Sequence, residues 1–180
     1  MKISYGITVC NEHKELKHLI NFLNQIIDSE DEIVIVYDQN RVTKEVHQVL
    51  EEYNDLIKHY PFNFQQNFLK NKNYMNTKCN GDYIFQIDAD EIPQEFLVEN
   101  IKEYRWNVNE KGWVNWPDAQ KRIYKNTPEI LWTGHQVHGM VTGYKTWGNL
   151  PMEEEWSISH NKTINRQESQ NDRYNQIETG

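Results

Sequence analysis

The first ninety residues alternate between short apolar runs and longer amphipathic segments. The apolar runs are typical of strands, and we expect them at Ile3–Val9, Glu32–Tyr37 and Tyr83–Ile87. The second of these is a continuous β-branched run, which indicates a strand buried on both faces of a parallel sheet. A further short strand is expected over Lys58–Phe62, ended by Pro61.

Helical spacing of the apolar residues connects these strands. The first predicted helix buries the apolar residues from Leu16 to Ile27 and has Asn11 as its N-cap. The second buries the apolar residues from Val42 to Ile57, and the third extends from Phe68 to Lys78. The order β-α-β-α-β-α-β predicts an α/β fold, with a Rossmann-related, mostly parallel sheet flanked by helices.

The pattern changes after Pro93, which suits the first turn of a fourth helix ending near Tyr104. Residues 112–151 contain many Trp and Gly residues and short β-like pieces, which predict a mixed or antiparallel C-terminal extension of the sheet. The polar tail over 161–177 is expected to form an exposed final helix. A chain of 180 residues fits one domain, so we expect a single domain over residues 1–180.

Charge and composition narrow the class of partner. The chain has 27 acidic and 19 basic residues, a net charge of −8 and no Lys/Arg stripe, so nucleic-acid binding is not expected. Cys10 and Cys79 form no zinc or redox pattern. The first apolar run is too short for a signal peptide, and no run is long enough for a transmembrane segment, so we expect a cytoplasmic protein.

Polar side chains follow the predicted strands at the edge where α/β proteins bind ligands. Asn11 follows the first strand, Asp38 the second, and Asp88 and Asp90 follow the buried strand that starts at Tyr83. Residues i and i+2 at a strand end point to the same side, so both carboxylates can face one cation. Carboxylate oxygens suit Mg²⁺ or Mn²⁺, which bridge carboxylates to phosphate groups.

Other residues extend this site. Glu12 adds a second polar group after the first strand, where a base and ribose can bind. Lys72 and Asn73 precede the strand that leads into Asp88 and Asp90, and they can reach a phosphate or the base. His160 is the preferred third metal ligand, since it follows a predicted short strand and imidazole binds Mn²⁺. Helix capping and simple solvent exposure remain alternatives for these side chains, and Glu91 is expected to support its acidic neighbours.

Several segments carry a family resemblance. YGITVCNE, IVIVYDQN and KNYMNTKCNGDYIFQIDADEIP resemble family 2 glycosyltransferases of the GT-A fold, which have a nucleotide-binding first half and a DxD metal motif. RIYKN, LWTGHQVHG and ISHNKT are similar to the family's second half, with its arginine-bearing strand and late histidine. The resemblance implies a compact GT-A-like domain, with residues 1–93 as the nucleotide-binding half and 94–180 as the acceptor-side half.

The resemblance also implies a reaction: metal-dependent transfer of a sugar from a nucleotide-sugar, expected to be UDP-linked, to a hydroxyl of a glycan, lipid-linked or protein acceptor, with inversion. The implied nucleotide-sugar-binding residues are Thr8, Asn11, Glu12, Asp38, Lys72, Asn73 and Asp88. Asp88, Asp90 and His160 would bind Mn²⁺ or Mg²⁺. Asp90 is also treated as catalytic, and Glu154, in an acidic run, is the candidate base. Relatives carry an acid where this chain has Gly139.

Two alternatives stay open. The first is a non-catalytic nucleotide- or glycan-binding module, favoured by Gly139 and by the short chain. The second is a phosphohydrolase of the haloacid dehalogenase type, which also ends a buried strand in DxD. In those enzymes the motif ends the first strand of the domain and its fifth residue is Thr or Val, whereas this chain has Ile92.

Overall fold

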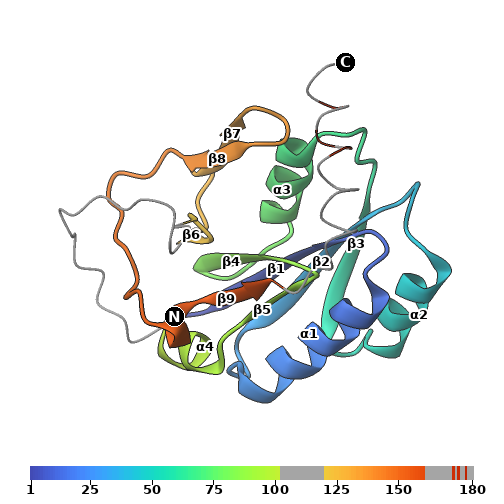
Figure 1. Cartoon of the computed structure of the whole chain (residues 1–180), viewed down its shortest axis with the longest axis horizontal. Coiled ribbons are helices and arrows are strands. Elements are labelled where there is room, and N and C mark those ends of the chain that lie inside the picture. Colours follow the sequence, from blue (N-terminus) through green and yellow to red (C-terminus); the bar gives the residue numbers. More distant parts are fainter. Residues whose placement is uncertain (102–119, 161–171, 173, 175–176, 178–180) are drawn as a thin grey trace.

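A computed structural model describes residues 1–101 and 120–160, together with residues 172, 174 and 177 (Figure 1). The helices of the described chain are α1 His13–Ile26, α2 Lys44–Glu52, α3 Phe68–Asn76, α4 Glu95–Asn100 and the short 3₁₀ helix η1 Glu154–Trp156. The strands are β1 Ile3–Val9, β2 Glu32–Asp38, β3 Ile57–Phe62, β4 Tyr83–Asp88, β5 Glu91–Pro93, β6 Ile123–Lys125, β7 Leu131–Gly134, β8 Gly139–Thr142 and β9 Ile158–His160.

The central sheet has the strand order β3-β2-β1-β4-β6. Its first four strands are parallel, and β6 joins β4 in the antiparallel direction. Two small antiparallel sheets, β5–β9 and β7–β8, come from the second half of the chain. The predicted α/β fold with a mostly parallel sheet and an antiparallel extension is therefore confirmed.

Apolar cores cover both faces of the sheet. Successive residues of a strand point to opposite faces, so Ile33 and Ile35 pack with α1, α2 and α4, whereas Val34 and Val36 pack with α3. Figure 1 shows α1 and α2 on one side of the sheet, and α3 with the β7–β8 hairpin on the other. The carboxyl ends of the parallel strands form the edge at which an α/β sheet binds ligands.

The predicted boundary of the first helix was wrong. Glu12, and not Asn11, occupies the N-cap position of α1, and it makes no side-chain capping hydrogen bond. Its carboxylate instead accepts hydrogen bonds from the backbone N–H groups of Cys10 and Asn11, at 2.8 and 2.9 Å. The second helix is also shorter than predicted, because Thr43 caps it through Val46 N–H and Ile57 already belongs to β3.

The predicted positions of Pro61 and Pro93 relative to the neighbouring elements were wrong. Pro61 lies inside β3, opposite Tyr37, rather than at its end. β3 is the edge strand of the sheet, where a missing N–H costs no ladder bond. Pro93 lies in β5, opposite Ile158 of β9, and α4 begins two residues later. The predicted end of that helix near Tyr104, the GWVNWP segment and most of the predicted final helix lie outside the described residues.

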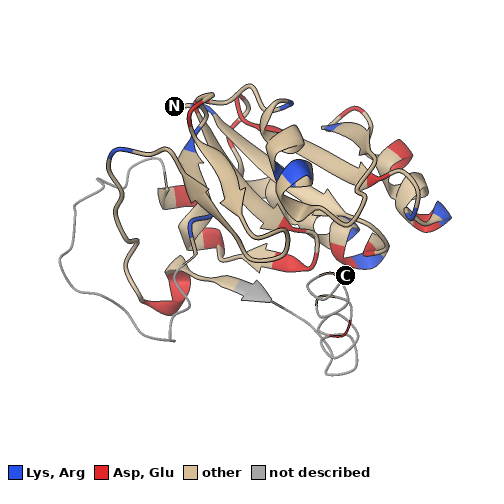
Figure 2. Cartoon of the chain, turned by 90° about the horizontal axis from the view of Figure 1, so that it is seen from above, with Lys and Arg blue, Asp and Glu red and all other residues tan. Residues whose placement is uncertain are grey.

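Two further observations concern the length of the described helices and the distribution of basic residues. None of the described helices is both long and apolar enough to cross a bilayer. In Figure 2 the Lys and Arg positions of the described chain lie on separate elements and form no continuous stripe.

Candidate active site

The candidate site begins where β1 and β4 end side by side. β1 is followed by α1 and by β2 on one flank, whereas β4 lies on the other flank, so the sheet order reverses between β1 and β4. Thr8 of β1 is paired in register with Asp88 of β4. Ligands of open α/β sheets bind at such a reversal, outside the carboxyl ends of the strands.

Asp88 is held in place by two neutral donors. Thr8 Oγ1 and Gln86 Nε2 both donate hydrogen bonds to Asp88 Oδ1, at 3.0 and 2.8 Å. Arg122 Nη1 lies 3.7 Å from Asp88 Oδ2, and 38% of the Asp88 side chain is exposed. Burial raises the pKa of Asp88, but the charges of Lys72 and Arg122 and the two hydrogen bonds outweigh it and hold this pKa well below its usual range. Asp88 is therefore a carboxylate at neutral pH, with part of its surface open to solvent.

Glu91 and Arg122 form the support beneath this carboxylate. Glu91 is only 5% exposed, and its Oε2 accepts a hydrogen bond of 2.9 Å from the Asp88 backbone N–H. Its Oε1 accepts a hydrogen bond of 2.7 Å from Arg122 Nη2, while Arg122 Nη1 donates to Gln86 Oε1 at 2.6 Å. Asp90 lies between Asp88 and Glu91 in the sequence and is also buried. The expected supporting role of Glu91 matches this arrangement.

Gln86 and Arg122 were not proposed as site residues from the sequence. Gln86 is fully buried inside an otherwise apolar strand, and that interruption of YIFQI was a readable signal of a polar network. Arg122 precedes β6, and its approach to Gln86 follows from the antiparallel pairing of β6 with β4. The backbone repeats the link, because Gln86 N–H donates to Arg122 O at 2.8 Å.

Lys72 and Asn73 lie on α3, and the structure separates their environments. Lys72 Nζ donates to Gln86 Oε1 at 3.3 Å, so it reaches the Asp88 network. Asn73 makes two bonds of 2.8 Å with the backbone of Trp132 in β7, accepting from its N–H and donating to its carbonyl. Its amide thus joins α3 to β7, and the structure gives Lys72 the more direct place in the site.

Asp38 and Glu12 lie at the ends of β2 and β1. Asp38 is buried, and its Oδ1 accepts a hydrogen bond of 3.1 Å from Asn40 N–H, which fixes the turn after β2. Glu12 fixes the turn after β1 through the two backbone bonds given above, and Asn11 is exposed. Turn formation therefore accounts for one oxygen of Asp38 and for one carboxylate oxygen of Glu12.

The two late candidates lie on different elements. β9 pairs with β5 so that the backbone of His160 is opposite Glu91, one residue from Asp90. The backbone of His160 thus lies near the acidic pair, and its role as a metal ligand stays a prediction. Glu154 is exposed on η1, four residues before β9 begins.

A sequence-family comparison decides the classification. The model of "Glycosyl transferase family 2" matches residues 4–105, which is more than half of the chain. The chain belongs to glycosyl transferase family 2. No curated protein matches it.

Solved structures agree with this family 2 assignment at the level of fold. TarS of S. aureus matches with a TM-score of 0.56 and 19% identity, covering 74% of this chain and 30% of the TarS chain. The TarS 1–349 structure matches with a TM-score of 0.55 and 18% identity, covering 74% of this chain and 50% of that chain. This chain thus spans half or less of these relatives. The neighbours have the GT-A fold, and the family 2 assignment disfavours the alternative of a DxD phosphohydrolase.

The donor set of this family 2 site fits a divalent cation only in part. Asp88 and Asp90 carry carboxylate oxygens, which are of the kind that hard cations bind, and Asp88 is already deprotonated. Within the described residues, however, no group of three or more His, Cys, Asp or Glu side chains is arranged to hold a metal ion. A cation here would take its further ligands from outside this set, and water or phosphate oxygens commonly complete the coordination of Mg²⁺.

Gly139 marks the departure from relatives noted in the sequence. A Cβ at this position would lie 1.9 Å from Cδ2 of Leu69 in α3. An acidic side chain at 139 would require the Leu69 side chain to move, because β8 lies close to α3 there.

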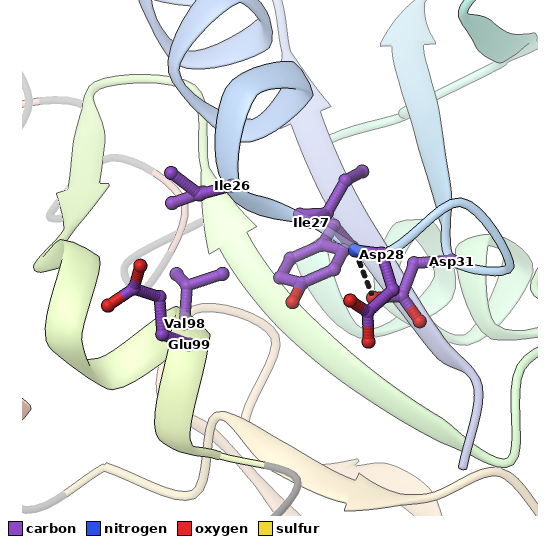
Figure 3. Close-up of a pocket in the computed structure, with 7 residues that line it drawn as sticks. Ile26, Ile27, Asp28, Asp31, Val98 and Glu99 are labelled. Carbon is purple, nitrogen blue, oxygen red and sulfur yellow. Dashed lines mark hydrogen bonds between the residues drawn. The ribbon is translucent and has the colours of Figure 1, made fainter.

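A pocket at the opposite edge of the domain is distinct from this site. It is lined by residues from the end of α1, the loop before β2, α4 and β1: Tyr5, Ile26, Ile27, Asp28, Asp31, Val98 and Glu99 (Figure 3). Burial, together with the charges of Asp31 and Asp28, raises the pKa of the Tyr5 hydroxyl. None of the candidate site residues lines this pocket, which lies at the amino end of β2.

Proposed function

We propose that this family 2 domain transfers a sugar from a nucleoside diphosphate sugar to a hydroxyl acceptor with the help of a divalent cation. One observation carries the proposal: a deprotonated, partly exposed Asp88 lies at the reversal of strand order, beside the cationic groups of Lys72 and Arg122. An acidic and a basic group at one edge suit a ligand that brings both a cation and phosphates.

The nucleoside would bind where β1 and β2 end. Asp38 has one oxygen engaged by Asn40 N–H, which leaves its second oxygen to accept a hydrogen bond from a base. Asn11 and Glu12 would border the base and ribose. Thr8 would position Asp88 on the β4 side of the bound nucleotide. We expect a UDP-linked donor.

The diphosphate would lie toward β4. Lys72 would contact it from α3, and Asn73 would act through the position of β7. Asp88 and Asp90 would hold Mn²⁺ or Mg²⁺, with His160 as a third ligand. When bound, such a cation neutralises charge that develops on a leaving diphosphate. Lys72 adds a fixed positive charge to the same region.

The acceptor would approach from the β5–β9 side, where Glu154 lies on exposed η1. An inverting transfer needs a base near the acceptor oxygen, and we propose Glu154 for this role. Glu154→Gln should then lower the transfer rate while leaving donor affinity unchanged, with Glu153→Gln as the matched control. The anomeric configuration of the product, read by NMR, tests inversion.

Donor binding is tested by thermal shift with UDP, GDP, CDP and ADP, each with and without Mn²⁺. We expect stabilisation by one base, and only when nucleotide and metal are both present. Asp90→Asn should abolish it, whereas Asp55→Asn on the exposed surface should not. Unchanged metal-dependent binding in Asp90→Asn would contradict the proposal. Sugar transfer or hydrolysis with the matching nucleotide-sugars then separates an enzyme from a module that only binds.

A further inference from the structure

The ammonium group of half-buried Lys72 lies between two polar or aromatic neighbours. Its Nζ lies 4.1 Å from the ring centre of Trp132 and 3.3 Å from Gln86 Oε1. Both neighbours are electrically neutral. A cation above an indole face is attracted by the ring quadrupole, most strongly where water is excluded.

Two other lysines of the domain show the contrast. Lys17 and Lys58 contact the carboxylates of Glu52 and Glu32 at 2.7 and 2.6 Å. Lys72 makes no ion pair of 4.0 Å or less with a residue of the described chain. Burial and the charge of Arg122 lower the pKa of Lys72, while the charges of Asp88 and Glu91 oppose this shift. Trp132 and Gln86 therefore hold the ammonium in place without cancelling its charge.

Trp132 is itself fixed from three directions. Its backbone N–H and carbonyl bond to Asn73, its Nε1 donates to Tyr124 Oη at 3.0 Å, and Tyr124 Oη donates to Asn76 Oδ1 at 2.9 Å. The side chain is 9% exposed. Figure 1 shows β7 beside α3, which is the contact these bonds make. These bonds therefore hold the indole ring in one orientation, and the Lys72 ammonium lies over one of its faces.

We infer that Trp132 is a positioning residue for the donor diphosphate, holding the Lys72 ammonium beside Asp88 as a charge that a phosphate can still use. This inference rests on the proposed function. An ammonium has three N–H donors. Gln86 takes one and the indole face another, so one remains for an anionic ligand. A cation that is already in place loses little freedom when the ligand arrives, which favours affinity.

Calorimetric titration of the full chain with UDP and Mn²⁺ tests this inference. Trp132→Leu should weaken binding by about 5- to 30-fold, the range expected for a desolvated cation–π contact. Trp132→Phe, which keeps a ring to pack against, should lose less. Uridine, which lacks phosphates, should bind all variants equally. Tyr74→Leu is the matched control, since it removes a ring 4.7 Å from Nζ of Lys78.

The double variant separates positioning from packing. If Trp132 acts through Lys72, Trp132→Leu should change UDP affinity less than about twofold in a Lys72→Met background, because contacting residues are coupled. An equal loss in both backgrounds would overturn the inference and leave Trp132 as a packing residue. Unchanged affinity in Trp132→Leu and Trp132→Phe would overturn it as well.

A ligand-free measurement distinguishes the two possible failures. In the intact chain, the Lys72 Cε protons should be shifted upfield by the indole ring, and this NMR shift should disappear in Trp132→Leu. If the shift is present but no nucleoside diphosphate binds, the proposed function fails and the inference with it. If UDP binds and the shift is absent, only the inference fails.

Discussion

Thr8 Oγ1 donates a hydrogen bond of 3.0 Å to Asp88 Oδ1, across the boundary between β1 and β4. The two residues are register partners at the carboxyl ends of strands that are eighty positions apart in sequence. The contact therefore joins β4, which leads into the acidic pair, to β1, the first strand of the domain. It also fixes one oxygen of Asp88, so that the other oxygen faces Arg122.

Thr8→Val keeps the shape of the side chain and removes this donor. We expect a loss of about 1 kcal/mol in the free energy of unfolding, the usual net worth of one hydrogen bond. The pKa of Asp88 should rise, because one group that favours its charged form is lost. Urea unfolding measures the first effect and NMR titration the second. Thr8→Ser retains the hydroxyl and should behave like the parent in both, and equal losses in Ser and Val would contradict the role of the hydroxyl.

Sequence reasoning succeeded where a single strand decided the outcome. The apolar runs located β1, β2 and β4, and the strand order of an α/β fold then placed Asp38 and Asp88 at one edge. Reasoning failed where a contact between distant segments decided it. Arg122 reaches Gln86 only because β6 pairs with β4, over a separation of 36 residues. Pro61 was misread for a related reason, since its tolerance depends on β3 being an edge strand.

Asn73 shows a different limit of the sequence. The position of Asn73 before β4 favoured a role in ligand binding, and that role stays a prediction. The structure adds a second role, because the amide bonds in both directions to the Trp132 backbone. No local pattern in the sequence indicates a partner 59 residues away.

Arg122→Met should be strongly destabilising. It removes the counter-charge of Glu91, which is 5% exposed, and breaking a buried pair from one side typically costs about 3–5 kcal/mol. Glu91→Gln removes the carboxylate charge that Arg122→Met would leave without its partner, and it keeps an oxygen to accept the hydrogen bond from the Asp88 N–H. The double variant should therefore recover about 1–2 kcal/mol relative to the sum of the single changes, as expected for coupled neighbours. Chemical unfolding of the four proteins measures the cycle, and simple additivity would contradict the pair.

Asn73→Ala should loosen the β7–β8 hairpin from α3. Two hydrogen bonds of 2.8 Å are lost, for an expected cost of about 2–3 kcal/mol in unfolding free energy. The Trp132 backbone N–H should exchange faster with deuterium, because Asn73 Oδ1 is its acceptor. Asn40→Ala is the matched control, since it removes one exposed bond to Asn63. An unchanged exchange rate at Trp132 in Asn73→Ala would refute the docking role.

Glu32 makes the domain sensitive to acid at the sheet edge opposite the site. It is buried, and its carboxylate accepts hydrogen bonds from Ser4 Oγ, Asn80 N–H and Lys58 Nζ. Burial raises its pKa, but these bonds and the charge of Lys58 outweigh burial and lower the pKa from 4.5 to about 2. A carboxyl group with a lowered folded-state pKa contributes stability above its unfolded pKa and loses that contribution as the pH falls. The Glu32 contribution should thus be complete above pH 4.5 and decline between pH 4.5 and about 2.

Glu32→Gln tests this linkage. At pH 7 we expect the variant to be about 1–3 kcal/mol less stable, since the hydrogen bonds to a charged acceptor become bonds to a neutral one. Toward pH 2 the difference should shrink, because the parent carboxylate becomes protonated while the amide does not titrate. Urea unfolding of both proteins at pH 7, 4 and 2.5 measures the difference. Glu52→Gln, at an exposed ion pair with Lys17, should leave the stability nearly unchanged. A gap between parent and Glu32→Gln that stays constant with pH would contradict the lowered pKa of Glu32.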